Sequence, residues 1–126
     1  MKSVFTNGCF DVLHRGHMEL LKYCSSLGRV IVGLNNDDSV RRLKGPSRPF
    51  FGERDRKFML EGCRYVHRVE LFAEDTPYEL IKSLRPDIIV KGGDYRIEDV
   101  VGNDLAEVKI FNFVDGYSTT NILEKL

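Results

Sequence analysis

Short runs of apolar, β-branched residues alternate with stretches of helical spacing along the chain, and this alternation limits the fold more than any other feature. The run Val30-Ile31-Val32 is typical of a strand that is buried on both faces. Before it, Leu20, Leu21 and Cys24 fall at helical spacing, and Gly28 marks the expected end of that helix. Strands that alternate with helices are joined by right-handed crossovers and form a parallel sheet covered on both faces.

The predicted fold is therefore α/β, a Rossmann-like three-layer α/β/α sandwich with a five-stranded parallel sheet. Strands are expected at residues 3–5, 29–34, 68–72, 87–90 and 107–113. Helices are expected at residues 16–27, 39–43, 53–63 and 77–84, and a last helix is expected after residue 120.

Local signals refine the predicted helices. Residues 35–38 read as a polar turn with a helix N-cap. Thr76 is expected to cap the next-to-last helix, with Pro77 at its first position, where the missing N–H group costs nothing. In the helix at 53–63, we expect Phe58 and Met59 to face inward because both are apolar.

Composition limits the domain count and the partners. A chain of 126 residues with 42% hydrophobic residues is expected to form one globular domain over 1–126. Lys+Arg and Asp+Glu both number 19, so the charge gives no case for a nucleic-acid or membrane surface, and no apolar run reaches the ~20 residues that span a bilayer. The three cysteines form no CxxC pair, and the first strand begins too early for a signal peptide. We therefore expect a cytoplasmic protein with no nucleic-acid or membrane partner.

Residues 6–17, Thr-Asn-Gly-Cys-Phe-Asp-Val-Leu-His-Arg-Gly-His, join the first strand to the first helix. A helix start exposes backbone N–H groups and the positive end of the helix dipole, which together favour bound phosphate. His14 and His17 are three residues apart, so they share one face of the first turn. The two histidines can donate hydrogen bonds to one polyphosphate. Alternatively, with Asp11, they can be the metal ligands of a phosphohydrolase.

Further polar loops follow the second, fourth and fifth strands, and ligands of parallel sheets bind beyond the carboxyl ends of the strands. Lys44 and Arg48 form either a solvated basic turn or a lid that brings Lys44 onto a triphosphate. Residues 91–95, Lys-Gly-Gly-Asp-Tyr, form either a tight turn or a close backbone approach to a ligand. Residues 117–120, Tyr-Ser-Thr-Thr, cap a helix, bind phosphate, or do both.

The pattern Gly-Cys-Phe-Asp-x-x-His-x-Gly-His at residues 8–17 resembles the HxGH signature of the cytidylyltransferase-like nucleotidyltransferases. Ser118-Thr119-Thr120 resembles the second signature of this superfamily. Three more stretches narrow the resemblance to the bacterial heptose-1-phosphate adenylyltransferases, and this resemblance covers nearly the whole chain. The three stretches are Leu43-Lys44-Gly45-x-x-Arg48-Pro49, Glu74-Asp75-Thr76-Pro77 and Lys91-Gly92-Gly93-Asp94-Tyr95. The segment 96–106 is shorter than the corresponding segment of that group usually is.

This resemblance implies an enzyme that transfers AMP from ATP to heptose 1-phosphate, releasing pyrophosphate and forming ADP-heptose for lipopolysaccharide biosynthesis. It implies Mg²⁺ on the nucleotide phosphates with few protein ligands, and a homodimer. Two alternatives stay open. One is a CTP-dependent cytidylyltransferase acting on glycerol 3-phosphate or a related alcohol phosphate. The other is a non-catalytic nucleotide-binding module, which would not need both histidines and Lys44.

The resemblance also implies the residue roles. His17 is expected to contact the α-phosphate and His14 the β- and γ-phosphates. No residue is expected to bind a metal ion directly. Catalytic roles are expected for His14, His17, Lys44 and Arg56; nucleotide contacts for Gly8, Cys9, Phe10, Gly16, Gly92, Asp94, Tyr117, Ser118, Thr119 and Thr120; and substrate contacts for Asp11, Asn35 and Lys91.

Overall fold

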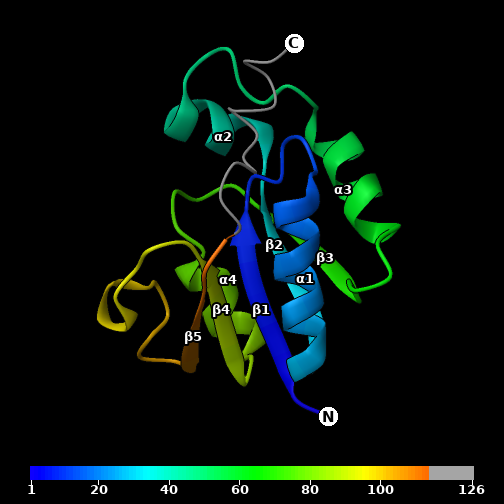
Figure 1. The fold of residues 1–126 in the computed structure, drawn as a ribbon. Coiled ribbons are helices and arrows are strands. Elements are labelled where there is room, and N and C mark those ends of the chain that lie inside the picture. Colours follow the sequence, from blue (N-terminus) through cyan, green and yellow to red (C-terminus); the bar gives the residue numbers. More distant parts are fainter. Residues whose placement is uncertain (114–126) are drawn as a thin grey trace.

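Five parallel strands form one sheet in the computed structural model, which describes residues 1–113 (Figure 1). The strand order is β3-β2-β1-β4-β5, so β1 lies at the centre. The strands are β1 (Ser3–Gly8), β2 (Arg29–Asn35), β3 (Arg68–Phe72), β4 (Ile88–Gly92) and β5 (Glu107–Phe111). The helices are α1 (Arg15–Leu27), α2 (Asp37–Lys44), α3 (Glu53–Glu61), α4 (Tyr78–Leu84) and the 3-10 turn η1 (Ile97–Asp99).

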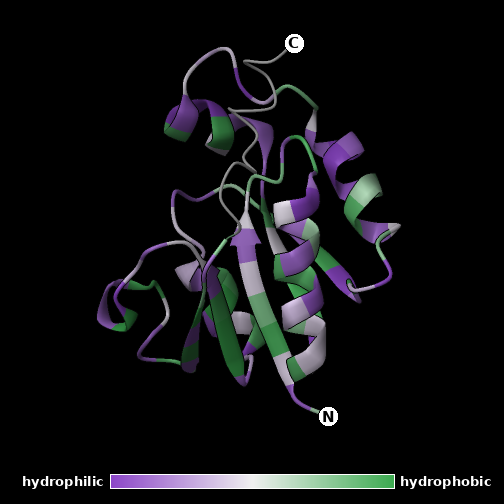
Figure 2. Ribbon diagram, in the orientation of Figure 1, coloured by the Kyte–Doolittle hydropathy of each residue, from purple (hydrophilic) through white to green (hydrophobic). Residues whose placement is uncertain are grey.

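Alternate residues of each strand face opposite sides of the sheet and build two core layers. Val4 of β1 packs in the layer beneath α1 and α3, with Leu21 and Leu60. Its neighbour Phe5 packs in the other layer, with Ile81 of α4. Figure 1 shows α1 and α3 over one face and α4 over the other, and Figure 2 shows the apolar residues gathered along the strands. The predicted three-layer α/β/α fold with its five-stranded parallel sheet is confirmed.

The helix at 53–63 was predicted with the wrong face inward. Phe58 and Met59 are 75% and 57% exposed, whereas Arg56 and Leu60 are buried. Arg56 and Leu60 are four residues apart and therefore lie on one face of α3. The buried face includes an arginine because its guanidinium bonds to backbone carbonyl groups beneath the helix, which an apolar pattern does not reveal.

The start of α4 also differs from the expectation. The helix α4 begins at Tyr78, and Pro77, not Thr76, is its N-cap residue. The Pro77 carbonyl accepts the first intrahelical bond, from the N–H group of Ile81, so the helix starts without a side-chain cap. By contrast, the N-cap expected within residues 35–38 is confirmed, because Asn36 Oδ1 accepts a hydrogen bond from Ser39 N at 2.9 Å.

The short segment between β4 and β5 folds back onto the sheet rather than extending from it. Val100 is buried in the core layer beneath α4. Gly102 follows in a left-handed conformation with φ of +92°, and a Cβ there would lie 2.8 Å from Ile89. Among residues 1–113, no helix has the length and apolar character needed to cross a bilayer.

Gly33 of β2 lies against the ring of Phe5, and this contact yields a stability prediction. A Cβ at Gly33 would lie 2.6 Å from Phe5 Cζ and 3.3 Å from Leu80. Gly33→Ala therefore forces the core to shift, and we expect the free energy of unfolding to fall by about 1–3 kcal/mol. Urea denaturation followed by circular dichroism measures this.

Gly62→Ala is the matched control for this change. Gly62 has right-handed helical backbone angles, and the nearest atom to an added Cβ is 3.5 Å away. Equal stability of the Gly33 and Gly62 variants would contradict the packing described for Gly33.

Candidate active site

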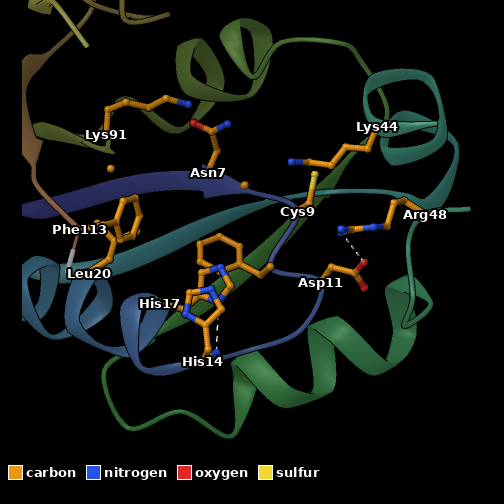
Figure 3. A pocket seen from close by; sticks show the side chains of 13 residues that line it. Asn7, Cys9, Asp11, His14, His17, Leu20, Lys44, Arg48, Lys91 and Phe113 are labelled. Atoms are coloured by element: carbon orange, nitrogen blue, oxygen red, sulfur yellow. Dashed lines mark hydrogen bonds and ion pairs between the residues drawn. The ribbon is translucent and has the colours of Figure 1, made fainter. Parts of the chain in front are cut away.

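A cavity of about 380 Å³ opens at the carboxyl ends of β1 and β4, where parallel sheets bind their ligands. The loop from β1 to α1 forms its floor, and the ends of α2, β4 and β5 supply its other walls. Figure 3 shows these side chains. The lining residues are Asn7, Gly8, Cys9, Phe10, Asp11, His14, His17, Leu20, Lys44, Arg48, Lys91, Gly92 and Phe113.

His14 and His17 cap the first turn of α1 and hold each other in place. His14 is the N-cap residue, and its Nδ1 accepts a hydrogen bond from Gly16 N at 3.1 Å. His17 Nδ1 accepts a hydrogen bond from His14 N at 3.3 Å, which completes a reciprocal capping box. Their rings stack with centroids 3.9 Å apart. Because each Nδ1 is an acceptor, each neutral ring carries its proton on Nε2.

Both histidines are held neutral. Burial, and to a smaller extent the neighbouring His14, lower the pKa of His17 to about 4. Burial also lowers the pKa of His14. Two stacked imidazolium rings would repel each other, so the neutral pair is the stable state. At neutral pH the pair therefore offers N–H donors rather than positive charges, placed at the N-terminus of α1, which favours a bound anion.

The cavity has a cationic end and an apolar end (Figure 3). Lys44 and Arg48 line one end. Phe113 and Leu20 form the apolar wall of the other, and Lys91 also lies on that side. The rings of His14 and His17 lie between them in this view. A phosphorylated ligand with an apolar portion fits this distribution of charge.

Gly92 is required at the apolar end by close contact. A Cβ at Gly92 would lie 2.4 Å from the ring of Phe113, so any other residue would displace this wall of the cavity. Beside it, the ammonium group of Lys91 lies 4.9 Å from the centroid of the Tyr95 ring, a cation–π distance.

Phe10 has an unusual backbone at the turn before the histidines. Its φ is +44°, in the left-handed region that L residues seldom adopt. The ring of Phe10 lies 5.1 Å from that of His17, centroid to centroid, and is buried. Such conformations persist where surrounding packing holds them, often at functional sites.

Four residues with predicted roles lie outside the cavity lining. Gly16 is buried in α1, and its N–H group orients His14. Asn35 is buried, and its side chain donates a hydrogen bond to Ser39 Oγ. Asp94 is exposed beyond the end of β4, and Arg56 is enclosed under α3. The predicted contacts of Tyr117, Ser118, Thr119 and Thr120 fall outside the described residues.

Four lining residues were not among the predicted site residues. Asn7 was detectable, because it is the polar residue directly before Gly8 at the end of the first strand. Arg48 follows Lys44 in a loop for which the sequence indicates only a basic turn or a lid. Leu20 and Phe113 are apolar residues in apolar patterns, so the sequence has no signal that separates them from the core.

The alternative metal site of a phosphohydrolase is not assembled. Asp11 Oδ1 and Oδ2 accept hydrogen bonds from Phe51 N and Phe50 N, at 2.9 and 2.7 Å. Both carboxylate oxygens are therefore bonded to backbone N–H groups, and Asp11 does not form a ligand set with His14 and His17. Across the part of the chain that the structure describes, no three His, Cys, Asp or Glu side chains come together as metal ligands.

The capping box predicts the tautomer and titration of His17. We expect imidazole ¹⁵N NMR at pH 7 to show a proton on Nε2 and none on Nδ1 of both histidines. His17 stays neutral until about pH 4, whereas its unfolded value is 6.5. Below pH 6.5 His17 is protonated in the unfolded chain but stays neutral in the folded one. The free energy of unfolding therefore falls as the pH drops from 6.5 toward 4.

The same protein in concentrated urea is the control for this titration. His14 and His17 should both titrate near 6.5 there, because burial is lost. A folded His17 that titrates near 6.5, or that carries its proton on Nδ1, would contradict the geometry.

Comparisons with known proteins agree with this fold. The family model described as "Cytidylyltransferase-like" matches residues 5–125. The bifunctional protein HldE of Nitratiruptor sp. is 54% identical over 125 residues, 98% of this chain and 27% of that protein. HldE of Helicobacter pylori is 50% identical over 127 residues, 99% of this chain and 27% of that protein. The chain thus spans about a quarter of the length of these relatives.

Two crystal structures share the fold. A lipopolysaccharide core biosynthesis protein from Thermoplasma volcanium aligns with a TM-score of 0.75 and 28% identity, over 94% of this chain and 99% of that one. A macrolide-efflux protein from Streptococcus pneumoniae aligns with a TM-score of 0.70 and 26% identity, over 98% of this chain and 52% of that one. With a family match over residues 5–125, the chain belongs to the cytidylyltransferase-like family of nucleotidyltransferases.

Proposed function

We propose that this chain transfers AMP from ATP to heptose 1-phosphate, releasing pyrophosphate and forming ADP-heptose. The observation that carries the proposal is the pair of neutral histidines that share one cavity with Lys44 and Arg48. An oxygen of the acceptor phosphate attacks the α-phosphorus in line, and the bond from the α-phosphorus to pyrophosphate breaks. No covalent enzyme intermediate forms, so the protein acts by positioning and by stabilising charge on phosphoryl oxygens.

The histidine pair suits this chemistry because it donates hydrogen bonds without changing its charge. His17 Nε2 donates to the α-phosphate, and His14 Nε2 donates to the β/γ side. Charge that develops on the phosphoryl oxygens then meets fixed donors at a helix N-terminus, which require no reorganisation during the reaction.

The two ends of the cavity suit the two parts of the reaction. Phe113, Leu20 and the backbone at Gly92 offer an apolar surface for base and ribose. Lys44 and Arg48 offer positive charge for the acceptor phosphate or the departing pyrophosphate. Gly8 and Cys9 bring the backbone close to the phosphates, and the segment 117–120 is assigned to the triphosphate.

Magnesium enters with the nucleotide in this proposal. Asp11 is the one carboxylate among the described lining residues, and both of its oxygens are bonded to backbone N–H groups. Within residues 1–113 no lining carboxylate is left to hold the ion, which would be held by phosphate oxygens and water, as Mg²⁺ commonly is at nucleotide sites. When bound, it supplies charge neutralisation on the phosphates.

Heptose 1-phosphate is the preferred acceptor on two grounds. The loop Leu43–Pro49 and the Lys-Gly-Gly-Asp-Tyr stretch resemble the heptose group, and the relatives named HldE match nearly the whole chain. A crystal structure with the same fold is named for lipopolysaccharide core biosynthesis. The second candidate is CTP-dependent transfer to glycerol 3-phosphate, favoured by the description of the matching family model.

We also propose a cytoplasmic homodimer. Phe58 and Met59 of α3, and Phe51, which lines a cavity with them, are exposed apolar side chains that a second copy would cover. Size-exclusion chromatography with light scattering tests the dimer directly.

The reaction is tested by pyrophosphate release with Mg²⁺, crossing ATP and CTP against heptose 1-phosphate and glycerol 3-phosphate. We expect turnover with ATP and heptose 1-phosphate. Turnover with CTP alone would replace this proposal by the second candidate. No turnover with any pair, although the nucleotide binds, would reject both acceptors.

The histidine role is tested in the same assay. His17→Ala removes one fixed donor, and we expect kcat to fall by ~10²–10³-fold. His67→Ala is the control, since His67 Nδ1 accepts a hydrogen bond from Val30 N away from the cavity, and kcat should be unchanged. A loss of less than about tenfold in the His17 variant would remove its assigned role.

A further inference from the structure

We propose, resting on the proposed function, that Asp11 and Arg56 are positioning residues that hold the backbone of one residue from both sides. This residue is Phe51, in the loop that runs from α2 to α3 and carries Arg48. We call Asp11, Arg56 and the backbone of Phe51 the loop clamp. Its task is to set the cationic end of the cavity relative to the histidine pair.

Asp11 forms the first half of the loop clamp. Its two carboxylate oxygens accept hydrogen bonds from Phe50 N at 2.7 Å and Phe51 N at 2.9 Å. Arg48 Nη1 lies 3.4 Å from Asp11 Oδ2, and the side chain of Asp11 is only 3% exposed. A buried carboxylate needs such charge-assisted bonds, and they tie residues 48–51 to the loop that precedes His14.

Arg56 forms the second half. Its Nε donates to Phe51 O at 2.9 Å, and its Nη1 donates to Cys9 O at 2.9 Å and to Asn35 O at 2.8 Å. Its Nη2 donates to Asp37 Oδ1 at 2.8 Å. The side chain is 0% exposed, so a phosphate in the cavity cannot reach it without displacing these partners.

The two halves meet at Phe51 and at the loop after β1. Asp11 holds the Phe51 N–H group, and Arg56 holds the carbonyl of the same residue. Asp11 belongs to the loop after β1, and Arg56 bonds to the Cys9 carbonyl of that loop. The loop that carries Arg48 is therefore fixed to the loop that carries His14, although the two are more than thirty residues apart in the chain.

The contact between Arg56 and Asp37 also affects the position of Lys44. Asp37 is the first residue of α2, and Lys44 is the last. Arg56 binds the Asp37 carboxylate, and Asp37 N donates to Glu53 Oε1 of α3 at 3.0 Å. Both cations at this end of the cavity thus depend on the same hydrogen-bond network. A displacement of about 1 Å of such groups can cost ~10²-fold in rate.

A double-mutant cycle separates positioning from a general structural role. Asp11→Asn keeps the size of the side chain but replaces one acceptor oxygen by a donor. We expect kcat/KM for the sugar phosphate to fall by ~10–10²-fold, with the Kd for ATP changed by less than about threefold. If Asp11 acts through the cations, Asp11→Asn should lower kcat/KM by less than about twofold in a chain that already carries Lys44→Ala and Arg48→Ala.

Asp87→Asn is the matched control. The Asp87 carboxylate also accepts a backbone hydrogen bond, from Ser3 N at 2.8 Å, but at the opposite end of the sheet. We expect no change in kcat/KM. Equal costs of Asp11→Asn in the two backgrounds, or full kcat/KM in the single variant, would overturn the loop clamp.

Amide hydrogen exchange tests the loop clamp without any activity. Asp11→Asn should speed exchange of the Phe50 and Phe51 amides and leave the amides of α1 unchanged. Unchanged exchange at Phe50 and Phe51 would overturn the loop clamp even if no acceptor is ever turned over. An inactive native enzyme would reject the proposed function alone, so the two failures are distinguishable. Arg56→Lys adds a second variant, in which the ammonium group cannot span the four acceptors.

Discussion

Every segment that lines the cavity within residues 1–113 leaves the sheet at one edge, because all five strands run parallel. The central strand β1 delivers the histidine loop, and its two neighbours β2 and β4 deliver the loops on either side. Side chains that are distant in sequence thus meet by topology alone. Topology alone does not hold these irregular loops in one arrangement, so further interactions are needed.

Buried hydrogen bonds to backbone groups hold the loops in place. Asp11, Arg56 and His14 each bond to main-chain atoms of a loop or a helix start rather than to one another. A charge that leaves water needs several partners, and loop peptides have unpaired N–H and C=O groups to offer. The cations around the cationic end of the cavity therefore divide into two kinds. Lys44 and Arg48 line the cavity, whereas Arg56 lies under it.

The sequence predicted the sheet, the strand bounds at 68–72 and the position of the histidine loop, because these depend on local periodicity and on the rule for parallel sheets. It failed at α3, where Phe58 and Met59 are exposed and Arg56 is inside. A hydrophobic pattern assumes that burial follows apolarity, and Arg56 is buried by long-range bonds to Cys9 and Asn35. Phe113 was missed for the related reason that an aromatic wall of a cavity has the same pattern as a core residue.

The choice between ATP and CTP is hard to read from the sequence for a physical reason that the site makes plain. The apolar end of the cavity is shaped by Phe113 and by the absence of a side chain at Gly92, and both features fit any base. In the proposed reaction, backbone N–H and C=O groups would contribute to discrimination among bases, and their positions follow from loop geometry and not from residue type. The cationic end has side chains with recognisable chemistry, so the reaction class is visible in the sequence while the base is not.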